Sequence, residues 1–403
     1  MAVKNYKVDA FGPYTQTGTS VNSRFPVLPP SEKGIVVCAT DKNGVAKDEV
    51  IQLTSGDIDE FVEKVGSAVE APDGFYCVKA FLANGGRYLD VVCPTSAGDT
   101  LTVAEATTDA AQDAVELSDA SILMVPKPST WTSDGYGGND AQDVDKVWID
   151  FVDTLKDGRM FYVFGVPQAL TIADAIDYIV DGTTGVNRSS QQAACYFPNS
   201  NVPAVGGGVK LVDICGSVGG LWARVSRDHP QEVAKAPAGS IATWHLKGIS
   251  SLEQDLFKRS DTIKASLQNA LINPVFSDGG IYVFGASTML DDVDDVFRHI
   301  NIARLHTYIR QQCHLLANAF IFEGFNDFTR DSLETKIKAF GQSMIDRQML
   351  ALGGFSSGVA FDDLFFVRVK QNEVNLSEVD VQVGYAPVFP IEFIVFTVTA
   401  QVA

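Results

Sequence analysis

Only one pattern in the chain has the spacing of a catalytic nucleophile. Residues 354–358 read Gly-Phe-Ser-Ser-Gly and fit the Gly-x-Ser-x-Gly elbow of α/β hydrolases. In that elbow the serine lies between a strand and a helix, and the histidine follows later in the chain. Here the motif follows a predicted helix and precedes a predicted strand, and the last histidine is His314. A loop that ends a helix is therefore the better interpretation.

Patterns for phosphate or metal binding are also incomplete. The dipeptide Gly-Lys of a P-loop does not occur, and no Gly-x-Gly-x-x-Gly follows a predicted strand. His299, His306 and Arg310 share one face of a predicted helix, which we interpret as a solvated or interfacial polar face because zinc needs closer spacing and a third ligand. The four aspartates of residues 291–295 are interpreted as helix caps. We therefore expect neither an enzyme nor a bound metal or cofactor.

The composition is that of a globular, strongly acidic protein. Of the 403 residues, 46% are hydrophobic and 20% are charged, with 50 acidic and 31 basic side chains and a net charge of −19. Such a surface repels nucleic acid and anionic membranes, so we expect no direct binding to either. No segment is apolar enough to cross a bilayer or to serve as a signal peptide, which predicts folding in a cytoplasm. The six cysteines form no Cys-x-x-Cys pair and are interpreted as buried free thiols.

Strands and helices alternate along the first three quarters of the chain. Apolar runs predict strands at residues 34–40, 88–93, 121–125, 160–166, 193–197 and 281–285. Helical periodicity predicts helices at residues 57–65, 75–83, 144–155, 169–180, 216–225 and 251–258. This order predicts an α/β body with a doubly wound, mostly parallel sheet that helices cover on both faces.

The chain changes character after this body. Two long helices at 291–319 and 331–352 precede strands at 364–370, 379–386 and 391–402, which predicts an α+β domain. We therefore divide the chain into an extended arm at 1–30, an α/β domain at 31–287 and a C-terminal domain at 288–403. Residues 94–118 are rich in Ala, Thr and Asp and are predicted as a surface excursion.

The last predicted strand needs a partner. Residues 391–402 are rich in β-branched and aromatic side chains and would be an aggregation hazard as an exposed edge. The strand either closes the sheet of its own chain or pairs with the sheet of a neighbouring subunit, and its residues alone leave both possibilities open. The side chains that this pairing would bury are Ile391, Phe393, Val395, Phe396 and Val398.

Several stretches along the chain, in this order, resemble contractile tail sheath proteins of phages and of phage-derived injection systems. They include GIVVCAT at 34–40, VKAFLANGGRYLDVV at 78–92, FYVFGVP at 161–167, GGLWARVSR at 219–227, VAKAPAG at 233–239, GIYVFGASTML at 280–290, FEGFND at 322–327 and VGYAPVFPIEFI at 383–394. Together these stretches extend from about residue 31 to residue 400, so chance matches to single motifs do not explain them.

The resemblance implies a structural subunit that polymerises as a sixfold helical cylinder around an inner tube and contracts to drive the tube through a target envelope. Its implied partners are other copies of itself, the inner tube protein, and baseplate and tail terminator proteins. Assembly would take place in a bacterial cytoplasm, and the product would be part of a virion tail or of a released extracellular particle. In the family, the arm and the last strand of neighbours complete a sheet of the C-terminal domain. Here the acceptor residues would be Phe366, Val367, Val369, Val381 and Val383.

The positive charges of one helix suggest where the tube is bound. The predicted helix at 331–352 offers Lys336, Lys338 and Arg347 on an otherwise acidic molecule, and we expect these cations to contact the tube. The competing interpretations are a hydrolase-like α/β enzyme and another kind of phage structural protein.

Overall fold

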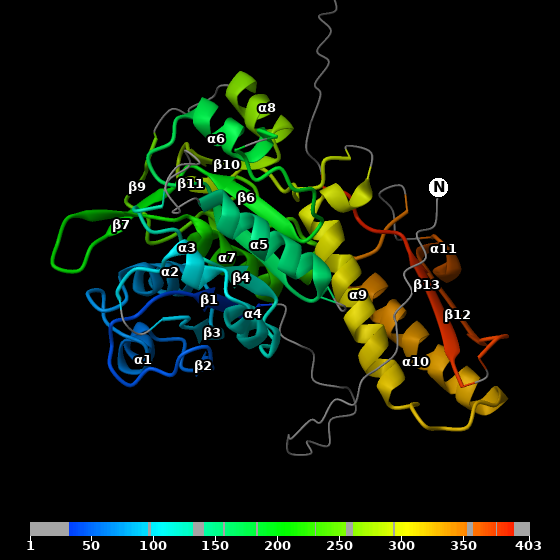
Figure 1. Cartoon of the computed structure of the whole chain (residues 1–403). Helices are drawn as coiled ribbons and strands as arrows, with labels where there is room; N and C mark the ends of the chain where they lie inside the picture. Colours follow the sequence, from blue (N-terminus) through cyan, green and yellow to red (C-terminus); the bar gives the residue numbers. More distant parts are fainter. Residues whose placement is uncertain are drawn as a thin grey trace, which may run out of the picture.

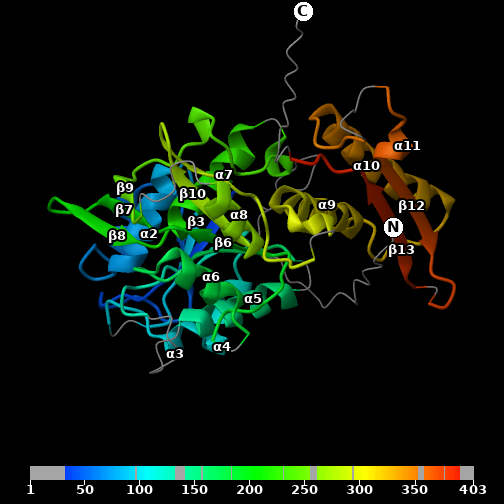
Figure 2. The same ribbon diagram turned by 90° about the horizontal axis from the view of Figure 1, so that it is seen from above.

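A computed structural model describes residues 32–95, 98–131, 141–155, 158–182, 184–229, 231–254, 261–292, 295–352, 358–375 and 377–390. These residues form an α/β body and a smaller C-terminal lobe (Figure 1). In two perpendicular views the long helix α9 (Ile300–Asn318) lies between the body and the strands of the lobe (Figure 2).

The body is built on an eight-stranded sheet with the order β11-β10-β6-β5-β4-β1-β3-β2. The six inner strands run parallel, and the edge strands β2 and β11 are antiparallel to their neighbours. The predicted mostly parallel sheet is thereby confirmed. The strands are β1 (Gly34–Val37), β2 (Val50–Leu53), β3 (Leu89–Val92), β4 (Ile122–Met124), β5 (Phe161–Gly165), β6 (Ala193–Phe197), β10 (Ile272–Ser277) and β11 (Ile281–Val283).

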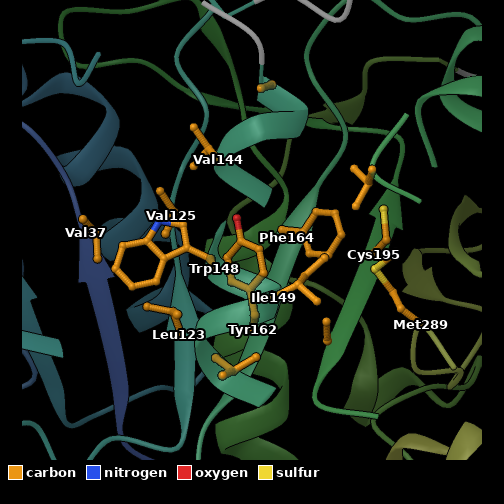
Figure 3. Close-up of a cluster of buried hydrophobic side chains, with 14 of the residues drawn as sticks. Val37, Leu123, Val125, Val144, Trp148, Ile149, Tyr162, Phe164, Cys195 and Met289 are labelled. Atoms are coloured by element: carbon orange, nitrogen blue, oxygen red, sulfur yellow. The ribbon is translucent and has the colours of Figure 1, made fainter. Parts of the chain in front are cut away.

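Both faces of the sheet are covered by helices, which explains why its strands are apolar throughout. Along β5, Tyr162 and Phe164 point into one core while Phe161 and Val163 point into the other. Figure 3 shows the first core, where Trp148 of α5 packs beside Tyr162. The helices of the body are α1 (Ile58–Lys64), α2 (Pro72–Ala83), α3 (Val103–Ala106), α4 (Asp109–Glu116), α5 (Ala141–Thr154), α6 (Ile172–Val180), α7 (Cys215–Asp228) and α8 (Asp261–Asn269).

Two parts of the body differ from the sequence prediction. The segment expected as a surface excursion contains α3 and α4, and its side chains Ala106, Ala111 and Val115 are buried in the core. The prediction of a helix at 251–258 is wrong at its start, because Ser251–Leu252 is strand β9. It pairs with β7 (Ser200–Pro203), which also pairs with β8 (Val209–Val212). A partner about fifty residues earlier in the chain thus overrides the local helical pattern.

Helix α9 begins later than predicted, and α10 begins earlier. Helix α9 begins at Ile300, because Val296–Arg298 form a 3-10 turn that Asp295 caps by accepting from the Phe297 amide at 2.9 Å. Helix α10 spans Asp327–Asp346 and begins at a cap in which Asn326 accepts from the Thr329 amide at 3.0 Å. It ends before Gln348, whose left-handed φ of 59° turns the chain.

The lobe consists of α9, α10, α11 (Phe361–Leu364), β12 (Phe365–Gln371) and β13 (Val379–Tyr385). Its core joins Leu305 and Ile309 of α9, Ile337 of α10 and Phe365 of β12. Val233 of the body, in the 3-10 turn η1 (Glu232–Ala234), is buried in the same core. The lobe is therefore packed against the body and shares part of its hydrophobic core with it.

All six cysteines are free, and five of them are buried, as the sequence predicts. No helix in the described part of the chain is long and apolar enough to cross a membrane.

Candidate assembly interface

In the described part of the chain, the hairpin of β12 and β13 has no third strand on either side. The strands pair antiparallel with Phe365 opposite Tyr385 and Gln371 opposite Val379. At its two ends the Ala386 amide donates to Leu364 O at 3.0 Å and the Asn372 amide donates to Glu378 O at 2.9 Å. These bonds identify the even-numbered residues as the hydrogen-bonded pairs. The N–H and C=O groups of the odd-numbered residues therefore point to the outer edges, where no third strand pairs among the described residues.

The structure gathers the five predicted acceptor residues in this hairpin. Val367 lies opposite Val383, Val369 lies opposite Val381, and Phe366 lies opposite Gly384. Val367 and Val369 are only 5% exposed, whereas Phe366 and Val381 are 40% and 36% exposed. Val367, Val369, Val381 and Val383 thus carry the outward-pointing backbone groups, and Phe366 lies on the opposite face.

Helix α10 holds the hairpin from its inner face. Phe365 is fully buried, and a Cβ at Gly341 would come within 2.1 Å of its ring. Glycine is therefore required at this point of α10 for the strand to approach. An isolated two-stranded hairpin is marginal in water, so the packing against α10 is needed to stabilise it.

The chain leaves β13 along the exit segment, residues 386–390. The Val388 carbonyl accepts from Asn301 Nδ2 at 3.1 Å, and the Phe389 ring meets the edge of His299 at a centroid distance of 5.9 Å. Because His299 caps the first turn of α9, the exit segment runs from the hairpin toward the body (Figure 2). The predicted strand residues Ile391, Phe393, Val395, Phe396 and Val398, and the arm at 1–30, lie outside the described residues.

Of the two alternatives for the face that carries His299 and His306, solvated or interfacial, the structure favours an interfacial position within the chain. His306 is partly buried, and its Nδ1 lies 3.0 Å from Tyr385 Oη. Burial, assisted by the charge of Arg310, lowers the pKa of His306 to about 4, so the ring is neutral at physiological pH. His299 is the N-cap and not part of the helix. Both rings line the junction between α9 and the segment that follows β13.

The predicted tube-contact cations do not form one positive patch. Lys338 Nζ pairs with Glu334 at 2.7 Å, and Arg347 pairs with Glu232 of the body. Lys336 is exposed, and its ammonium lies 4.6 Å from the centre of the Phe320 ring. Sequence reasoning also missed a nearby feature. Phe322 lies in the turn between α9 and α10, and Phe328 lies in the first turn of α10; they are 103% and 81% exposed.

The strongest competitor for an active site is a buried charge cluster at the carboxyl ends of β4 and β5, where α/β enzymes bind their ligands. Lys127 Nζ lies 3.0 Å from Asp145 Oδ1 and donates to Gly165 O at 2.6 Å. Asp145 also accepts from Tyr162 at 2.7 Å. Burial raises the pKa of Asp145 despite the nearby Lys127 charge.

This cluster has no room for a substrate. Both charges are buried, and the adjoining cavity, which Asp73, Lys127 and Asp213 line, measures about 10 Å³. That is space for about one water molecule. In the described parts of the chain, no three His, Cys, Asp or Glu side chains are grouped to hold a metal ion. The cluster is therefore a filled polar core that ties α5 to the sheet.

Comparison with known proteins gives a consistent set of matches. Residues 292–401 match the family model of the phage tail sheath C-terminal domain. A tail sheath protein of Vibrio phage KVP40 is 26% identical over 221 residues, which cover 50% of this chain and 31% of that protein. The chain thus spans about a third of the length of this curated relative.

Solved structures share the fold over nearly the whole chain. A chain of the anti-feeding prophage baseplate has a TM-score of 0.69 at 19% identity, with 98% of this chain and 99% of that chain covered. A chain of the PVC sheath complex, an extracellular contractile injection system in the contracted state, has a TM-score of 0.68 at 21% identity and 97% and 99% coverage. The sheath tail protein Lin1278 of Listeria innocua has a TM-score of 0.59 at 11% identity and 89% and 92% coverage.

Proposed function

We propose that this chain, a contractile tail sheath protein by the matches above, polymerises as a sixfold helical cylinder around an inner tube and contracts to drive that tube through a target cell envelope. The body at residues 31–287 would be the outer sheath domain and residues 288–403 the inner one. In this role the chain needs no catalytic site, since the energy of contraction would be stored when the subunits assemble.

The open hairpin is the single observation that carries this proposal. Among the described residues no third strand pairs with β12 or β13, whose odd-numbered residues direct backbone groups outward, and the hairpin is supported by α10. A strand from another chain would satisfy those groups and bury apolar side chains, which is the usual physics of strand addition. We infer that residues 391–402 of one neighbour and the arm at 1–30 of another supply these strands.

The direction of the exit segment supports exchange over closure within one chain. It is bound to the first turn of α9 through Val388 and Phe389, on the side toward the body. A strand that begins after Pro390 would have to reverse at once to reach its own hairpin.

The partners follow from the same role. Other copies of the chain, an inner tube protein, and baseplate and tail terminator proteins would contact the sheath, without direct binding to nucleic acid or membrane. We place the tube contact on α10 and its flanks, with Lys336, Lys338 and Arg347 as candidates, and expect Lys336 to contribute most because Lys338 and Arg347 already pair with carboxylates. Assembly would occur in a bacterial cytoplasm, before the sheath becomes part of a virion tail or a released particle.

Electron microscopy tests the proposal. The chain produced alone in bacteria and viewed by negative stain should form hollow cylinders whose end views show six-toothed rings. A variant truncated after Pro390 should remain folded and soluble but form no cylinders. Absence of cylinders from the intact chain, alone and with its tube protein, would refute the sheath role, whereas cylinders from the truncated chain would refute strand exchange.

A further inference from the structure

Three contacts fasten the end of β13 and the exit segment to α9 in regular order. Tyr385 Oη lies 3.0 Å from His306 Nδ1, the Val388 carbonyl accepts from Asn301 at 3.1 Å, and Phe389 meets the His299 ring. As the chain advances from residue 385 to 389, its partners on α9 move back from 306 to 299. The segment therefore runs antiparallel to the first two turns of α9.

The other side of the exit segment is held as well. The Ala351 amide donates to Ala386 O at 3.0 Å, and Pro387 forms a β-bridge with Leu350. Leu350 is fully buried in the core of the lobe. The exit segment thus lies between α9 and the chain that follows α10, with contacts to both.

Asn301 connects this segment to the body. Its side chain is buried, and Nδ2 donates both to Val388 O and to Ala234 O of η1, each at 3.1 Å. A primary amide nitrogen has two hydrogens, so these two bonds use its full donor capacity. The same stretch of the body is tied to the end of α10, where Gln231 Nε2 donates to Gln348 O at 2.8 Å. One side chain therefore links the body, α9 and the exit segment.

We propose that Asn301, with His299 and His306, forms a clamp that fixes where the chain leaves the subunit, so that the strand link begins after Phe389. This inference rests on the proposed strand exchange. A strand held by a neighbour is pulled when subunits move relative to one another. With the exit segment clamped, the pull is transmitted to the body through Asn301 and η1, and the hairpin of the same subunit is not peeled apart. Asn301 acts here as a positioning residue.

Substitution of Asn301 gives the first test. In the full-length chain, Asn301→Ala should raise amide exchange in residues 386–390 at least tenfold, measured by hydrogen–deuterium exchange, with α10 unchanged. The fraction of subunits in sedimentable cylinders should fall at least fivefold. Asn318→Ala, at the exposed end of the same helix, is the matched control and should alter neither measurement. Unchanged exchange, or normal cylinders despite faster exchange, would overturn the clamp.

Insertions test directly where the clamp ends and the strand link begins. Two glycines inserted after Pro390 should change the yield of cylinders less than twofold, because they lie beyond the clamp. The same two glycines inserted after Ala386 should reduce the yield at least fivefold, because they shift Val388 away from Asn301. Equal yields from the two insertions would contradict the proposal.

Two further outcomes remain decisive. If Asn301→Ala fails to fold, Phe389→Ala replaces it, since this half-exposed ring can be removed without opening the core; normal cylinders and normal exchange in that variant would overturn the clamp. If the wild-type chain forms no cylinders, the proposed function fails, while the exchange measurement on Asn301→Ala still tests the clamp by itself.

Discussion

The ring of Phe365 on β12 lies against the backbone of Gly341 on α10, so closely that a Cβ at position 341 would meet ring Cδ1 at 2.1 Å. This contact joins the strands that we propose as the assembly site to the helix that supports them. Because Phe365 is fully buried, neither partner can move aside without opening the core of the lobe.

A methyl group at position 341 should therefore destabilise the lobe. We expect Gly341→Ala to lower the free energy of unfolding by about 1–3 kcal/mol, the usual cost of overpacking. Gly324→Ala is the matched control, because nothing lies within 4 Å of a Cβ at that position. Urea denaturation of both variants measures the difference. Equal stabilities would show that the hairpin is not held in this way.

Loss of the buried ion pair between Lys127 and Asp145 should destabilise the protein more than loss of a surface pair. Lys127→Met should cost about 3–5 kcal/mol, because it leaves the buried Asp145 without its cationic partner. Lys338→Met removes a more exposed pair with Glu334 and should cost less than about 1 kcal/mol. Thermal and denaturant unfolding of the two variants should separate them clearly. A similar loss in both would mean that the Lys127 cluster is not structural.

His306 should make stability depend on pH. Its pKa in the folded protein is about 4, below its ordinary value of 6.5, so the unfolded chain binds the proton more tightly. Its contribution to stability is therefore lost as the pH falls from about 6.5 to 4, by up to about 3 kcal/mol. Replacement by glutamine, which does not titrate, should flatten this part of the stability profile. An unchanged slope between pH 6.5 and 4 in His306→Gln would exclude this role.

The alternating direction of backbone groups allows the edge of β13 to be blocked selectively. Val381 is an odd-numbered residue, so its N–H points outward, whereas the N–H of Gln382 bonds within the hairpin. We expect Val381→Pro to leave the monomer folded but to prevent cylinders, because proline removes an edge donor. Gln382→Pro should instead destabilise the monomer itself. Normal cylinders from Val381→Pro would rule out strand addition at this edge.

Charge reversal on α10 tests the tube contact. Lys336→Glu should weaken sheath binding to the tube more than Lys338→Glu, because Lys338 already pairs with Glu334. The measurement is co-sedimentation of tube and sheath, with Lys47→Glu in the body as an exposed control. If reversal of Lys336, Lys338 and Arg347 together leaves tube binding at its normal level, this surface does not face the tube.

The central sheet could be predicted because its signal is local. Residues 161–165 and 193–197 are short apolar runs bounded by loops, and both faces of such strands are buried in the structure. The hairpin strands are also confirmed at 365–371 and 379–385. The start of α9 was placed too early, because the aspartates of residues 291–295 resemble a helix cap. The actual cap, Asp295, closes a 3-10 turn and not the helix.

By itself, the sequence determined the mostly parallel sheet, the two long helices, the hairpin and the resemblance to tail sheath proteins, because each depends on neighbouring residues and their order. Only the tertiary structure decided which charges remain available and which residues the histidines contact. Arg347 forms an ion pair with Glu232, and His306 forms a hydrogen bond with Tyr385. These partners lie about eighty residues or more apart in the chain, and no local pattern brings them together. For the same reason the role of Asn301 could not be predicted from the sequence, because its partners Ala234 and Val388 meet it only in the folded chain.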